Sequence, residues 1–219
     1  MSISDLLKFG GKRPDHSAGG ASDASSSKGA DAIVPSKALP KFIGALAARE
    51  SPILVDFGPV IGSNVAFFGE QLGCKLFIED LAADIDHHTR AGTRDALPEM
   101  LSKRFPKGDA TVDGVLCWDI FDFLDRTASQ ALAREIVRVL RPGGAVLGFF
   151  CNGAIERASF TKFEIVEEKT LRHRPHQGIG GPKFVLQNRD IIRMFDGLLV
   201  SDSFLLKSNT REILLRKRG

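Results

Sequence analysis

Short apolar runs alternate along most of the chain with stretches whose apolar residues recur at helical spacing. The runs are bounded by Gly, Pro and polar residues and predict buried strands at residues 53–56, 75–78, 112–118 and 145–150. Between and around them, the helical spacing predicts helices at residues 36–50, 64–72, 127–141 and 189–196. Alternating strands and helices indicate an α/β fold with a mostly parallel sheet. Two final runs, 204–207 and 212–216, flank a polar turn and predict an antiparallel hairpin.

Two segments do not follow this pattern. Residues 1–32 are rich in Gly, Ser, Ala and Asp and hold few large apolar side chains, so we expect a disordered leader before a single domain at 33–219. Residues 151–187 form a connection longer than most links between elements, and we expect a substrate-side insertion there. This connection includes a short strand at 163–166 and a basic run at 172–176, which is either a solvated loop or a site for an anionic substrate.

The most informative stretch joins the first of these strands to the following helix. The strand ends in Asp56, and the stretch continues through Gly58, Pro59 and Gly62 to Ser63 and Asn64, either of which can cap a helix. Glycines at such a turn let the backbone approach a ligand, and the start of a helix offers free N–H donors. The stretch therefore predicts a strand, a ligand-binding turn and a helix.

This spacing of Asp56, Gly58 and Gly62 resembles the first motif of the class I S-adenosylmethionine-dependent methyltransferases, with Val60 in place of the middle glycine. Residues 112–119 look like the fourth strand of that family, and the Leu-Arg-Pro-Gly-Gly run at 140–144 is typical of the link to its fifth. The resemblance covers residues 53–150 and implies a Rossmann-like, doubly wound sheet and S-adenosylmethionine as cofactor. It implies cofactor-binding roles for Asp56, Phe57, Gly58, Gly62, Glu79, Asp80, Trp118 and Asp119.

Within this set, Glu79 is expected to bind the ribose hydroxyls, with Asp80 as the second choice. The third strand of the family is not visible in the sequence, and Asp95 and Asp109 are the candidates for its acid.

No dedicated catalytic motif is visible. Asp119 is a candidate base by its position, and His173 or His176 can reach the site from the insertion. The Asn-Pro-Pro-Tyr type of motif is absent, which favours a small or medium-sized acceptor over a nucleic-acid base. The neighbours His87 and His88 point to different helix faces, so no metal site is expected.

Two other functions remain open. A catalytically impaired, methyltransferase-like binding or interaction protein is suggested by Val60 and by the missing third-strand acid. An NAD(P)-dependent oxidoreductase is suggested by the glycine-rich turn and Glu79 alone.

Composition limits the class of protein and the compartment that we expect. A net charge of +3 is too small to argue for nucleic acid, and 43% hydrophobic with 26% charged residues is ordinary for a globular protein. Cys74, Cys117 and Cys151 lack paired spacing, so we expect buried free thiols in a reducing compartment. No apolar run approaches the ~20 residues of a membrane span. We therefore expect a cytoplasmic enzyme with a small-molecule substrate, and the sequence leaves the oligomeric state open.

Overall fold

The computed structural model describes residues 31–105, 107–153, 160–175, 181 and 183–219. Its main sheet has six strands in the order β3-β2-β4-β5-β9-β8. The strands are β2 (Ile53–Asp56), β3 (Lys75–Ile78), β4 (Val112–Trp118), β5 (Leu140–Cys151), β8 (Leu198–Leu205) and β9 (Thr210–Lys217). β3, β2, β4 and β5 are parallel, whereas β9 pairs antiparallel with both β5 and β8. The predicted parallel sheet with a final antiparallel hairpin is confirmed.

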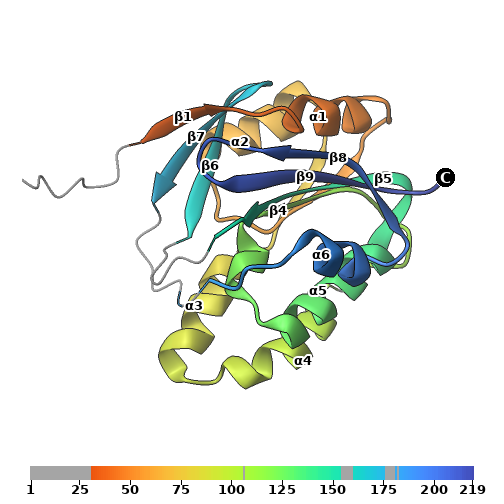
Figure 1. Cartoon of the computed structure of the whole chain (residues 1–219). Coiled ribbons are helices and arrows are strands. Elements are labelled where there is room, and N and C mark those ends of the chain that lie inside the picture. The colour runs from red at the N-terminus through yellow and green to blue at the C-terminus, as the bar shows by residue number, and fades with distance from the viewer. Residues whose placement is uncertain (1–30, 106, 154–159, 176–180, 182) are drawn as a thin grey trace, which may run out of the picture.

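Helices cover both faces of this sheet (Figure 1). One face carries α1 (Leu39–Ala47) and, after the turn, α2 (Gly62–Val65) with the π-helical η1 (Ala66–Gln71). The other carries α3 (Leu81–Ala91), α4 (Leu97–Lys103), α5 (Arg126–Val139) and α6 (Asn188–Met194), with short 3₁₀ turns η2 (Arg94–Ala96) and η3 (Ile120–Phe123). Successive strand residues point to opposite faces, so Leu54 and Leu116 pack under α1 while Val55 and Val115 pack under α3–α5. The doubly wound α/β fold is confirmed.

A second, three-stranded antiparallel sheet lies beside the carboxyl ends of the parallel strands (Figure 1). Its order is β1-β7-β6, formed by β1 (Ala32–Pro35), β7 (Thr170–Pro175) and β6 (Thr161–Glu167). The strand expected at 163–166 is confirmed and is longer than expected. Ala32, expected in the leader, belongs to β1, whereas residues 1–30 lie outside the described residues.

The prediction of a solvated loop for the basic run is wrong for residues 172–175, which belong to β7. Leu171 and His173 face inward, whereas the outward Arg172 and Arg174 both pair with Glu164 of β6. A two-residue period this short, ending in Pro175, is hard to distinguish from a charged loop.

Two helix starts differ from the sequence prediction, and the third strand that the sequence did not show is absent between β3 and β4 in the described residues. The helix after the turn begins at Gly62, because Ile61 is extended (φ −125°, ψ 115°), so neither Ser63 nor Asn64 is its cap. Gln187 rather than Asn188 caps α6. In the described residues between β3 and β4 there are only helices and turns; Asp95 lies in η2, and the exposed Asp109 pairs with Arg138. The third strand of the family is therefore missing from this part of the chain.

None of the helices in the described ranges combines the length and apolar character that crossing a bilayer requires.

Candidate functional site

Acidic and aromatic side chains meet where β2, β3 and β4 end. Asp56 closes β2, and its carbonyl oxygen accepts a hydrogen bond from the Glu79 N–H (2.8 Å), immediately after β3. Trp118 closes β4, the other neighbour of β2. Ligands of open α/β folds bind at this edge of the sheet. The structure therefore brings together the acid of the turn, the second-strand acid and the fourth-strand aromatic residue.

The Asp56 carboxyl is buried, and one of its oxygens accepts two hydrogen bonds from the chain itself. Its Oδ1 accepts hydrogen bonds from the Gly58 N–H (2.8 Å) and from the Trp118 indole Nε1 (2.5 Å). Burial raises the pKa of Asp56 from 3.8 to about 6, although both hydrogen bonds oppose the shift. Asp56 therefore shapes the turn and orients Trp118.

The two glycines of the turn have different surroundings. A Cβ placed on Gly58 would lie 2.7 Å from Cδ1 of the Trp118 ring, whereas nothing lies within 4 Å of one placed on Gly62. Val60 is 70% exposed, so its side chain does not fill the turn. Val60, which departs from the family motif, therefore leaves the space beside the turn open. The space beside Gly58 is occupied by the Trp118 ring.

Trp118 is 3% exposed because it stacks on one aromatic ring of β6 and one of β5. Its ring lies 5.0 Å from that of Phe163 on β6, with the planes 7° apart, and 6.2 Å from that of Phe149 on β5. Asn64 fixes the backbone around Phe163: its amide Nδ2 donates to the Phe163 carbonyl (2.8 Å), and its Oδ1 accepts from the Ile165 N–H (2.8 Å). The helix after the turn and strand β6 are therefore joined directly above the turn.

Three other residues expected to bind the cofactor, Glu79, Asp80 and Phe57, contact other parts of the chain. The Glu79 carboxylate, with its side chain 16% exposed, lies 3.3 Å from Arg104 Nη1. Asp80, with a left-handed backbone (φ 35°), caps α3 by accepting from the Ala83 N–H. The Phe57 ring is buried against Phe105 in the core, so only its backbone borders the turn.

Asp119 lies in a buried charge cluster with Lys183 and Asp122. Lys183 Nζ is 3.2 Å from Asp122 Oδ2 and 3.9 Å from Asp119 Oδ2, which also accepts from the Thr161 N–H (3.1 Å). Burial raises the pKa of Asp119 from 3.8 to about 7, although the nearby Lys183 opposes the shift. A carboxyl that titrates near neutral pH at a ligand-binding edge is suited to proton transfer.

Asp122 fastens both ends of the insertion. Its carboxylate accepts from the Cys151 N–H (3.0 Å) at the start, and its carbonyl oxygen accepts from the Phe184 N–H (2.6 Å) at the end. With Lys183 as its ion-pair partner, its role is structural.

His173 packs its ring against Phe163, with the centroids 4.8 Å apart. Its Nε2 is buried without a hydrogen-bond partner, and burial lowers its pKa, so the ring is neutral at physiological pH. His176, the other candidate base of the insertion, lies outside the described residues.

A cavity of about 290 Å³ adjoins these side chains. Aromatic, charged and hydroxyl side chains from both sheets and the insertion line it: Ala32, Asp119, Phe149, Thr161, Phe163, His173, Arg174, Pro175, Lys183, Ser208 and Thr210. Its size is near the lower end of the range for small-molecule sites. Since Phe163 stacks on Trp118, the aromatic stack separates this cavity from the Gly58 turn.

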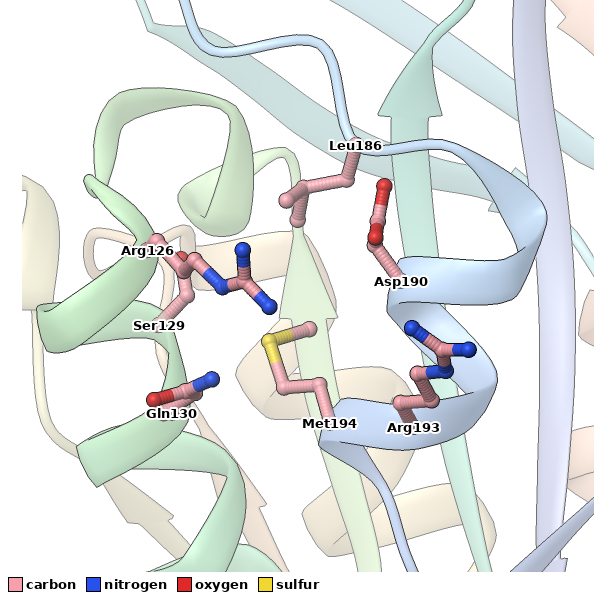
Figure 2. Close-up of a pocket in the computed structure, with 7 residues that line it drawn as sticks. All are labelled: Arg126, Ser129, Gln130, Leu186, Asp190, Arg193 and Met194. Carbon is pink, nitrogen blue, oxygen red and sulfur yellow. The ribbon is translucent and has the colours of Figure 1, made fainter.

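A different hollow lies between α5 and α6, and no residue of the turn after β2 lines it. Figure 2 shows the Arg126 guanidinium pointing into the gap between the two helices, with Met194 and Leu186 beside it. Its volume of about 30 Å³ suits a water molecule or two rather than a cofactor. An adjoining hollow of about 440 Å³ includes Arg134 and Arg193, both exposed, and no residue of the turn.

Sequence reasoning missed three residues of this site. Asn64 had the signature of a helix cap, Arg104 that of a surface residue at a helix end, and Lys183 that of a loop residue in the long connection. Each acts through a partner distant in the sequence, and no local pattern marks such a contact. Within the described ranges, no three His, Cys, Asp or Glu side chains are grouped as a metal site requires.

Residues 55–148 match the family model described as a methyltransferase domain. The matched segment runs from β2 through the turn, Glu79 and Asp119 to β5. Over this segment the chain is similar to the methyltransferase domain family. The resemblance seen in the sequence is thereby confirmed, and the nicotinamide-dependent alternative loses its main support because the turn and Glu79 both lie within the methyltransferase match. A search of curated proteins found no match.

The solved structures that resemble this chain have low sequence identity to it. A Burkholderia thailandensis 1,6-didemethyltoxoflavin-N1-methyltransferase, solved with 1,6-didemethyltoxoflavin and S-adenosylhomocysteine, is 17% identical; the match covers 84% of this chain and 78% of that one, with a TM-score of 0.48. A geranyl diphosphate methyltransferase in complex with GPP and sinefungin is 13% identical, with 83% and 77% covered and a TM-score of 0.48. The PH0226 protein of Pyrococcus horikoshii is 15% identical, with 77% and 83% covered and a TM-score of 0.47. At these values the likenesses carry no argument about activity.

S-adenosylmethionine, the methyl donor of this family, fits the turn of the methyltransferase domain only in part. The Gly62 side is open, and Glu79 stands beside Asp56. The Gly58 side is filled by Trp118, and a ligand cannot share that space with the indole. In the conformation described, the turn does not admit a ligand against both glycines.

Proposed function

We propose that this protein transfers a methyl group from S-adenosylmethionine to a small or medium-sized acceptor. The match of residues 55–148 to the methyltransferase domain carries the proposal. It is supported by the adjacency of Asp56 and Glu79 at the ligand-binding edge of the sheet and by the open Gly62 side of the turn. The sulfonium supplies an already activated methyl group, so the protein mainly has to position the acceptor and take up its proton.

We place the acceptor in the cavity lined by Asp119, Phe149, Phe163 and Lys183. The aromatic walls suit a planar molecule. Asp119, whose pKa of about 7 leaves it partly ionised at neutral pH, is our candidate for the group that accepts a proton from an acceptor hydroxyl or amine. Lys183 offers a positive charge to an acidic substituent. The acceptor class we infer is therefore a planar phenol, enol or amine, with room for one acidic group.

A second candidate function is favoured by Trp118. Because its ring occupies the space over Gly58, the chain also has the features of a methyltransferase-like protein that binds small molecules or partners without transferring a methyl group. In that case the cavity beside Asp119 binds a ligand and the turn does not.

The test is a calorimetric titration of the full chain with S-adenosylhomocysteine, S-adenosylmethionine and NADH. The proposal predicts saturable binding of both adenosyl compounds and none of NADH. Glu79→Ala should weaken that binding about tenfold, as loss of a charged hydrogen-bond partner does, while Glu99→Ala, on the exposed surface of α4, serves as the control. Preference for NADH would contradict the proposal, and equal affinities in the two variants would remove Glu79 from the site.

We also place the protein in a reducing compartment. Cys74, Cys117 and Cys151 are all free and buried, as thiols are in cytoplasmic proteins.

A further inference from the structure

Trp118 lies over Gly58 because of the contacts that its own side chain makes. The indole is held by one hydrogen bond to Asp56, by its stack on Phe163 and by a wider stack on Phe149. Its backbone is left-handed (φ 48°), a conformation that side chains larger than glycine rarely adopt. The residue that covers Gly58 is therefore held in a strained backbone conformation.

The buried hydrogen bonds between the helix after the turn and the strand that stacks on Trp118 are made by one side chain, Asn64. β6 is an edge strand: β7 pairs with one side of it, and in the described residues no strand pairs with the other. On that free side Asn64 supplies the two hydrogen bonds that a neighbouring strand would make, to the Phe163 carbonyl and the Ile165 N–H. Asn64 is 2% exposed. One buried amide therefore ties β6 of the β6–β7 hairpin to the helix that follows the turn.

We propose that Trp118 and the β6–β7 hairpin form a gate between the turn and the cavity beside Asp119. The gate is closed in this structure: the stack of Trp118 on Phe163 covers Gly58 and separates the two spaces. A ligand that lies against Gly58 takes the place of the indole, and the hairpin moves with its Phe163. Opening joins the turn to the cavity, so the gate couples entry of one ligand to access to the other. The identity of the ligand at the turn rests on the proposed function; the geometry of the gate does not.

The chain carries its own reporter of this motion. Trp118 is the only tryptophan, and there is no tyrosine, so intrinsic fluorescence comes from this one indole apart from weak phenylalanine emission. An indole that is 3% exposed emits at short wavelength, and displacement into water shifts the emission to longer wavelength. We therefore expect S-adenosylhomocysteine to shift the Trp118 emission, with the same dissociation constant that calorimetry gives.

Asn64→Ala tests whether the Asn64 hydrogen bonds hold the gate closed. Losing two hydrogen bonds that exist only in the closed state should shift the equilibrium toward opening and tighten S-adenosylhomocysteine binding about tenfold or more. Ser63→Ala, on the same helix, is the matched control, because its hydroxyl reaches only the exposed edge of Glu164 at 3.3 Å. Phe163→Leu removes the stack and keeps an apolar side chain, and it should act in the same direction in case Asn64→Ala folds poorly.

The outcomes separate the gate from the proposed function. Binding accompanied by an emission shift, or binding that is absent in the wild type and present in Asn64→Ala or Phe163→Leu, supports the gate. Calorimetric binding with unchanged Trp118 emission overturns the gate and leaves the methyltransferase proposal standing. Absence of binding in the wild type and in both folded variants overturns the gate and the proposed function together.

Discussion

The indole Nε1 of Trp118 lies 2.5 Å from Oδ1 of Asp56, so the acid that ends β2 holds the aromatic residue that ends β4. This bond joins the glycine-rich turn to the end of β4, and it places the indole where a ligand of the turn would lie. The same oxygen also fixes the Gly58 N–H, and the indole then lies over Gly58. A ligand at the turn therefore competes with a hydrogen bond of the protein itself.

The raised pKa of Asp56 should be visible in the pH dependence of stability. Its pKa is 3.8 in the unfolded chain and about 6 in the folded one, so the folded chain binds the proton more tightly. The free energy of unfolding should then fall by up to about 3 kcal/mol from this group as pH rises from about 4 to about 6. Asp56→Asn should lose this component in urea unfolding measured across that range. The exposed Asp196→Asn is the control, and identical pH profiles for Asp56→Asn and wild type would contradict the assignment.

Glycine substitutions should separate the covered side of the turn from the open side. Gly58→Ala places a methyl group 2.7 Å from the Trp118 ring, so we expect the indole to be displaced and its emission to shift to longer wavelength without any ligand. Gly62→Ala adds a methyl group with nothing within 4 Å and should leave the emission unchanged. Fluorescence spectra of the two folded variants check this, and a shift of equal size in both would contradict it.

Asp119 should determine the pH dependence of methyl transfer. With a pKa of about 7 and a role for the carboxylate as proton acceptor, kcat/KM should rise with pH and level off above about 7. Asp119→Asn should lower kcat about 100-fold or more and leave donor binding unchanged. The measurement is release of S-adenosylhomocysteine with an acceptor found by screening planar phenols and amines. A flat pH profile, or unchanged kcat in Asp119→Asn, would remove Asp119 from the reaction.

Asp122 should matter for stability rather than for chemistry. Asp122→Ala leaves the Cys151 N–H without its carboxylate and Lys183, 11% exposed, without its nearer partner. Breaking a buried ion pair in this way costs about 3 kcal/mol. Asp125→Ala, three residues away, removes the cap of α5 and should cost about 1 kcal/mol. Urea unfolding of both compares them, and a smaller loss in Asp122→Ala than in Asp125→Ala would contradict the fastening role.

Local pattern was sufficient to predict most of the fold. The apolar runs at β2, β3, β4 and β5 give strands because alternate side chains pack on both faces, and the final hairpin follows from two runs around a polar turn. The basic run of β7 was harder to interpret, because Arg172 and Arg174 find their partner, Glu164, only across the hairpin.

The sequence was sufficient to predict which residues belong to the site, but it did not predict the contacts between them. Asp56, Glu79, Trp118 and Asp119 meet at one edge because parallel strands end together. What the sequence could not show is that Trp118 turns back over Gly58, since that depends on Asp56, Phe163 and Asn64, three residues spread across the chain. The sequence also left open whether Val60 impairs the turn; its side chain is exposed to solvent and does not fill the turn.

Hydrogen exchange of the full chain, with and without S-adenosylhomocysteine, tests most directly whether the turn after β2 is a donor site closed by the hairpin. We predict slower exchange at residues 57–65 and at 79–82, together with faster exchange in β6, whose bonds to Asn64 are released. Unchanged exchange at the turn, or protection confined to the groove between α5 and α6, would contradict the account.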